Sequence, residues 1–196
     1  MRFRPLLSVA AACALSCTAF AQATPAPPPA DDPGPVVLDW TPPALAALSS
    51  EAAVRNSFTF DRNMLAAAAS LMDNDDEPTQ QAINHLDGVS VRLLRFGDMG
   101  IPDENAVDAI RDSYHLRGWK HIVTTTQAGG PVHNGTTDVW VVMDGVNLRG
   151  AVVLAETPRS LTLVTVAGNL SPVDLLHLRG HFGIPKFDGN DLGSLR

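Results

Sequence analysis

Cysteine is nearly absent from this chain of 196 residues, which contains only Cys13 and Cys17. Both lie in a short apolar run near the start, and Ala19-Phe20-Ala21 then supplies the small residues that a signal peptidase reads. We therefore expect residues 1–21 to be a signal peptide that is cleaved after Ala21. A mature chain without cysteine would have no disulfide, no thiolate nucleophile and no cysteine metal ligand.

A lipoprotein anchored through Cys17 is the alternative to a freely exported chain. A good lipobox has a large aliphatic residue three positions before its cysteine, and this chain has Ala14 there. The complete Ala-x-Ala site favours simple cleavage. We expect a periplasmic or secreted protein that is not lipidated.

Long hydrophobic runs and an excess of basic charge are also lacking. A membrane span needs roughly 20 apolar residues, and neither the signal segment nor any later run comes near that length. The formal net charge is −7, and loss of Arg2 and Arg4 with the signal peptide makes it −9. Because nucleic-acid binding depends on basic groups that meet phosphates, we expect no nucleic-acid partner and no transmembrane segment.

Composition divides the rest of the chain into three parts. Residues 22–35 are rich in proline, which predicts an extended linker. Residues 36–185 show helical and strand periodicity in turn and predict a single domain, long enough to bury a core. Residues 186–196 have no apolar periodicity and predict a loose tail.

The periodicity of the domain predicts six strands and four helices. Strands are expected at 52–60, 89–96, 119–126, 136–143, 148–156 and 160–168, the first with Val54, Phe58 and Phe60 on a buried face. A first helix is expected after the cap Asp61. Three more are expected from Pro78 to Gly88, from the cap Asp103 to Gly118 and from the cap Ser171 to Gly180. The pattern predicts an α+β fold: a two-layer sandwich in which a largely antiparallel sheet of about six strands carries helices on one face.

His177 and His181 are the most suggestive pair for a metal site, because a spacing of four places two side chains on one helical face. Gly180, however, falls where a left-handed residue would end the helix, which would leave His181 beyond it. Zinc would also need a further protein ligand that no motif identifies. We interpret the pair as a helix end.

Other candidate sites lack the pattern that their chemistry requires. The acidic stretches Asp73–Glu77 and Asp188–Gly193 lack the glycine and glutamate positions of an EF-hand, so we interpret them as solvated loops. The glycine-rich stretch 127–135 lies between strands and predicts a hairpin loop rather than a phosphate cradle. The histidines have no partner motif: His85, His115, His121, His133, His177 and His181. The sequence therefore predicts no catalytic, cofactor-binding or metal-ligating residue.

The three tryptophans could form an aromatic binding surface or pack in the core. Trp119 and Trp140 lie in predicted strands, which favours core packing. Trp40 stands beside prolines at the start of the domain, and we expect it to be the most exposed of the three.

Several stretches together resemble the bacterial family known as domain of unknown function 4252. They are "LAALSSEAAVRNSFTFDRNMLAAAASLM", "LDGVSVRLLRF", "LRGWKHIV" and "VVLAETPRSLTLVTVAGNLSPVDLLHLRGHFGIP", which together span most of 44–185. The resemblance implies an exported, compact α+β domain and a link to cell-envelope stress or sigma-factor regulation. It implies no catalytic residues. Many members are lipoproteins, and the poor lipobox here departs from them.

The sequence therefore favours an exported, non-catalytic module that binds an envelope protein or a small ligand. The alternative is a metal-assisted hydrolase built from dispersed His, Asp and Glu side chains. Because a function must be argued from a site and no motif marks one, the choice depends on which side chains the fold brings together.

Overall fold

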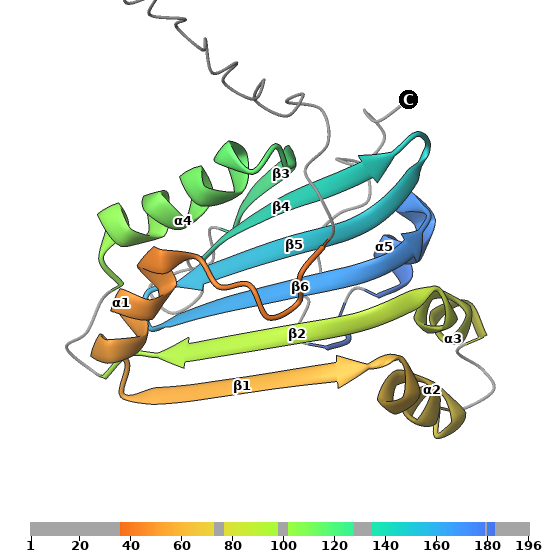
Figure 1. The fold of residues 1–196 in the computed structure, drawn as a ribbon. Helices are drawn as coiled ribbons and strands as arrows, with labels where there is room; N and C mark the ends of the chain where they lie inside the picture. Colours follow the sequence, from red (N-terminus) through yellow and green to blue (C-terminus); the bar gives the residue numbers. More distant parts are fainter. Residues whose placement is uncertain (1–35, 73–76, 98–101, 128–134, 179, 183–196) are drawn as a thin grey trace, which may run out of the picture.

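A computed structural model describes residues 36–72, 77–97, 102–127, 135–178 and 180–182. The predicted signal peptide and linker lie outside them, as do the acidic residues 73–76 and the tail from residue 183 onward. Figure 1 shows one sheet crossed by helices at its ends and along its upper part.

The sheet has six strands, and every neighbouring pair is antiparallel. The strands are β1 (Val54–Asp61), β2 (Leu86–Arg95), β3 (Lys120–Gln127), β4 (Gly135–Asp144), β5 (Asn147–Thr157) and β6 (Ser160–Leu170), in the spatial order β1-β2-β6-β5-β4-β3. The predicted α+β fold with a six-stranded antiparallel sheet is confirmed. β1 and β3 form its two edges.

Five helices accompany the sheet in the described part of the chain. They are α1 (Pro43–Glu51), α2 (Arg62–Ser70), α3 (Glu77–Asn84), α4 (Glu104–Leu116) and α5 (Pro172–His177). Three of them start at the predicted caps: the side chains of Asp61, Asp103 and Ser171 accept hydrogen bonds from backbone N–H groups of the first turn. These caps satisfy donors that a helix start would otherwise leave unpaired.

The helices cover both faces of the sheet, so the expectation that they lie on one face is wrong. On one face, α1 and α4 bury a cluster that includes Leu48, Ile110 and Trp140, which we call the α4-side core. On the other, α2, α3 and α5 bury the α3-side core, which includes Ile83 and Val141. The strands β4, β5 and β6 are apolar at successive positions, so each exposes apolar side chains on both faces and both must be covered.

One predicted helix end and one helix that the pattern did not predict separate the expectation from the structure. Gly88 does not end a helix: α3 ends at Asn84, and Gly88 lies within β2. α1 was not expected. Its residues Leu45 and Leu48 are buried against the sheet, and Pro43 occupies its first turn, where a missing N–H costs nothing.

β1 is also more exposed than its sequence alternation suggests. Val54 is 46% exposed and Phe58 is 53% exposed, although Phe60 packs against the α3-side core. Strand position is the reason: β1 is an edge strand, and α2 covers only its end. The predicted buried face is therefore wrong for all but Phe60.

Trp40 is the most exposed of the three tryptophans, as predicted, although it is partly buried. Its ring lies edge-on to the Tyr114 ring, with centroids 5.3 Å apart, and the Arg117 guanidinium lies 4.2 Å above it. Trp119 and Trp140 are buried, as expected. No described helix combines the length and apolar character that crossing a membrane requires.

Candidate functional site

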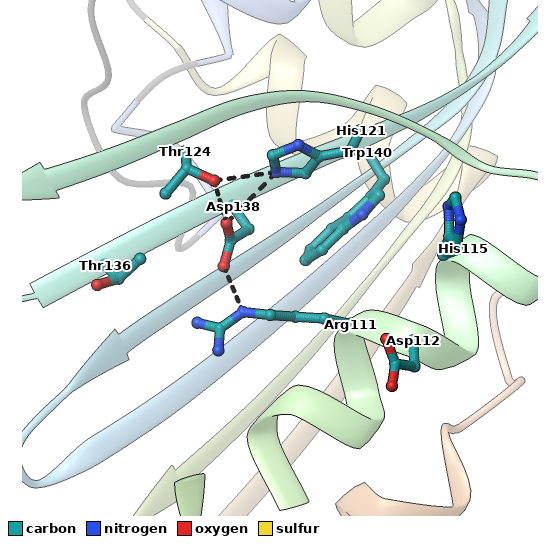
Figure 2. A pocket seen from close by; sticks show the side chains of 8 residues that line it. All are labelled: Arg111, Asp112, His115, His121, Thr124, Thr136, Asp138 and Trp140. Carbon is teal, nitrogen blue, oxygen red and sulfur yellow. Dashed lines mark hydrogen bonds and ion pairs between the residues drawn. The ribbon is translucent and has the colours of Figure 1, made fainter. Parts of the chain in front are cut away.

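A hollow of about 400 Å³ lies between α4 and the β3–β4 edge of the sheet. Eight residues line it: Arg111, Asp112, His115, His121, Thr124, Thr136, Asp138 and Trp140 (Figure 2). α4 supplies the first three, and β3 and β4 supply the others. Arg111 and Asp138, which are 27 positions apart in the sequence, therefore meet in one surface. We refer to it as the α4 hollow.

Asp138 is the buried charge of the α4 hollow, with a side chain only 5% exposed. Alternation along β4 places it on the same face as Trp140. One carboxylate oxygen, Oδ2, accepts from Nε of Arg111 at 2.8 Å, and the other, Oδ1, accepts from the Thr124 hydroxyl at 2.6 Å. Thr124 is directly opposite Asp138 in the β3–β4 register, so the pairing of the two strands sets this contact. The carboxylate is therefore held in one orientation.

Arg111 joins three carboxylates. Its Nε contacts Asp138, one terminal nitrogen contacts Asp108 at 2.7 Å, and the other contacts Glu156 at 3.1 Å. Burial opposes the positive charge, but these hydrogen bonds and the nearby negative charges outweigh it and raise the pKa of Arg111 above its ordinary value. Because each nitrogen already donates to a carboxylate, the guanidinium is poorly placed to clamp an anionic ligand.

His121 lies beside the same carboxylate, but not as it would in a nucleophilic triad. Its Nε2 lies 3.4 Å from Oδ1 of Asp138 and 3.1 Å from the Thr124 hydroxyl. In a triad the two ring nitrogens have separate partners, with the acid on one and the nucleophile on the other. Here one nitrogen meets both groups, while the Thr124 hydroxyl donates directly to Asp138. This arrangement does not activate the hydroxyl.

Stacked aromatic rings support the floor of the α4 hollow. Trp140 is 3% exposed and stacks on Tyr114 with ring centroids 5.5 Å apart, and His121 tilts over it at 5.3 Å. Burial raises the pKa of Tyr114, so its hydroxyl stays neutral. The aromatic floor gives the polar groups above it a rigid support.

The α4 hollow has an excess of negative charge. Arg111 is the one permanently charged cation among its described lining residues, whereas Asp112 and Asp138 line it and Asp108 and Glu156 adjoin it through Arg111. Asp112 is exposed and takes part in no ion pair among the described residues. The hollow therefore favours a ligand that carries a positive charge.

His177 and His181 do not share a helical face. His177 is the last residue of α5, Gly180 is left-handed with φ of 81°, and His181 lies beyond the helix. The interpretation as a helix end is therefore confirmed. His85 instead pairs with Asp174 of α5, its Nδ1 3.1 Å from the carboxylate, while His133 lies outside the described residues.

The sequence alone does not bring the residues of the α4 hollow together. His115 and His121 belong to no motif, and no motif in the sequence marks Arg111, Thr124 or Asp138. One signal was available: Asp138 is the single charged residue inside the apolar strand "TTDVWVVM", and a buried carboxylate needs a partner. Its partner, however, lies 27 positions away on a helix.

Within the described residues, no three His, Cys, Asp or Glu side chains come together as metal ligands. Comparison of the chain with models of protein families, with curated proteins and with solved structures found no match.

Proposed function

We propose that this chain is an exported, non-catalytic binding module whose recognition surface is the α4 hollow, and that its ligand carries a positive charge, as an amine or a basic peptide does. The observation that supports it is the excess of carboxylates over the single Arg111, above all the exposed Asp112, which takes part in no ion pair among the described residues. Fixed negative groups in an open hollow select a cation and disfavour an anion.

Two contacts of the α4 hollow support binding rather than bond cleavage. The Thr124 hydroxyl donates to a carboxylate instead of to a free base, and His121 approaches both groups through one nitrogen. No feature of the described residues favours the metal-assisted hydrolase. The proposed activity is therefore recognition alone.

Titration with tri-lysine and tri-glutamate peptides tests this function, followed through the backbone amide resonances of the ¹⁵N-labelled mature protein. Tri-lysine should shift the amides of α4, β3 and β4, and tri-glutamate should not. Asp112→Asn should weaken tri-lysine binding about threefold, the effect of one exposed ion pair. Asp144→Asn, which removes an exposed carboxylate from the β4–β5 turn, is the matched control and should leave binding unchanged.

Two results would reject the proposal: equal shifts with both peptides, or tri-lysine shifts that lie outside these three elements. Turnover of a test ester or phosphate by the purified protein would reject its non-catalytic part.

The export of the chain is a part of the proposal that rests on sequence alone. Mass spectrometry of the protein from fractionated cells should find an N-terminus at Gln22 in the periplasm or the medium. A lipid label on Cys17 would instead show that the chain is a lipoprotein. We also propose, from its four similar segments, that this chain is a member of the domain of unknown function 4252 family. Members of that family would then share the strand order of this sheet.

A further inference from the structure

The outer edge of β1 is long and regular. Its eight residues pair one to one with β2 and the register contains no bulge, while no described strand lies on its other side. An edge of this kind presents unpaired backbone N–H and C=O groups to any strand that can lie against it. Proteins usually protect such edges with charged side chains, lysine above all, or with proline, bulges or covering elements.

The opposite edge of the sheet combines several of these protections, whereas β1 carries only the charges of Arg55 and Asp61, near its two ends. β3 begins with Lys120, has a register shift between His121 and Val123, and lies beside α4. β1 contains neither lysine nor proline. The difference indicates that a further strand pairs with the β1 edge.

Charge and shape favour a second copy of the same strand. In an antiparallel pairing centred on Phe58, each Arg55 lies opposite Asp61 of the other copy, so two ion pairs form by symmetry, and the two Phe58 rings meet at the axis. A shift by one residue places Arg55 opposite Phe60 instead. Arg55 is exposed and has no ion-pair partner among the described residues. Cross-strand pairs of opposite charge and of aromatic rings stabilise sheets, which makes this register the favoured one.

The helices at the two ends of β1 lie on opposite faces of the sheet. α1 precedes β1 and packs into the α4-side core, whereas α2 follows it and packs into the α3-side core (Figure 1). A two-fold axis perpendicular to the sheet brings the start of one β1 beside the end of the other. On each face, the helix of one copy then lies beside a strand end that has no helix on that face.

We propose that two copies of this chain associate through antiparallel pairing of their β1 edges about Phe58, which joins two six-stranded sheets into one. The α4 hollow lies at the far edge of each sheet, beside β3 and β4, and stays open in the dimer. The dimer therefore presents two α4 hollows. Dimerisation through β1 does not depend on which ligand the α4 hollow binds.

Light scattering coupled to size exclusion, across a hundredfold range of concentration, tests the proposal on the mature protein. The wild-type chain should approach twice its monomer mass as concentration rises. Phe58→Lys, at an exposed position, should remain a monomer. Thr126→Lys, exposed on the β3 edge, is the matched control and should dimerise like the wild type.

A charge series checks the register and covers the case in which Phe58→Lys fails to fold. Arg55→Glu places like charges opposite each other and should abolish the dimer. Adding Asp61→Asn removes that repulsion and should restore part of the dimer, because Asn still caps α2. Hydrogen exchange should show β1 amides that are protected at high concentration in the wild type and unprotected in Arg55→Glu.

Three outcomes would overturn the dimer. These are a wild-type chain that stays monomeric throughout, a dimer that survives Phe58→Lys and Arg55→Glu, and β1 amides that gain protection only when envelope extract is added. The last would assign the edge to a strand of another protein.

Discussion

Nε of Arg111 donates to Oδ2 of Asp138 across 2.8 Å, and this bond joins the middle of α4 to the inside of β4. Neither residue is isolated, since Arg111 also holds Asp108 and Glu156. The pair therefore orients the helix on the sheet and holds the α4 hollow in shape.

Removing the Asp138 carboxylate should destabilise the protein. Asp138→Ala leaves Arg111 half-buried without its most buried partner, and we expect the free energy of unfolding to fall by about 2–3 kcal/mol, less than for a fully buried pair because Arg111 is partly screened by solvent. Urea unfolding followed by circular dichroism measures the change. Asp112→Asn, on the same helix but exposed and outside any described ion pair, should change stability by less than about 0.5 kcal/mol. Equal effects of the two variants would contradict a structural role for the pair.

The cap of α5 should make stability depend on pH. Burial acts to raise the pKa of Asp174, but hydrogen bonds from the backbone and hydroxyl of Ser171, and then the contact with His85, outweigh it and lower that pKa below its ordinary value of 3.8. The carboxylate therefore contributes its full stabilisation above about pH 4, the unfolded pKa, and loses it as pH falls through the lower folded pKa.

Urea unfolding at pH 7 and at pH 2–3 tests the role of this cap. At pH 7, Asp174→Asn should be less stable than the wild type by about 1 kcal/mol, and the gap should narrow at the lower pH. Asp144→Asn removes an exposed carboxylate and is the control, for which no comparable narrowing is expected. A gap for Asp174→Asn that is independent of pH would show that its charge plays no part in the cap.

Two buried threonines should respond in opposite directions to loss of the hydroxyl. Thr165 on β6 and Thr79 on α3 are both 4% exposed. The Tyr114 hydroxyl lies near Thr165, but neither hydroxyl has a hydrogen-bond partner among the described residues, whereas Thr79 donates to the carbonyl oxygen of His177 at 3.2 Å. Thr165→Val should be neutral or stabilising, and Thr79→Val should cost about 1 kcal/mol. Thermal unfolding of the two variants measures the difference, and a larger loss for Thr165→Val would show that its hydroxyl bonds to the nearby Tyr114 hydroxyl.

Gly168 should tolerate no side chain. A methyl group there would lie 2.4 Å from the carbonyl oxygen of His85 and 2.9 Å from Cα of Leu86, and both are backbone atoms that cannot move aside cheaply. We expect Gly168→Ala to cost about 2–3 kcal/mol, as overpacking does. Gly97→Ala meets nothing within 4 Å and is the control, neutral or slightly stabilising. Equal melting temperatures for the two variants would contradict this close approach.

Local chemistry made much of the secondary structure predictable. The side chains of Asp61, Asp103 and Ser171 satisfy nearby N–H groups within a single turn, so their positions alone mark where helices start. Gly180 ends the last helical segment because its backbone is left-handed, which few other residues adopt without strain. Exposure was harder to predict. Phe58 alternates like a core residue, yet it is exposed because β1 is at an edge.

By itself, the sequence determined the α+β class, the six strands, three helix starts and the end of α5, since each depends on contacts within a few residues. Only the tertiary structure decided which strands lie at the edges, which faces the helices cover, and that Arg111, Thr124 and Asp138 meet. The reason is that these relationships depend on strand order and on cross-strand register. Both follow from the packing of the whole core, and a short stretch of sequence does not encode them.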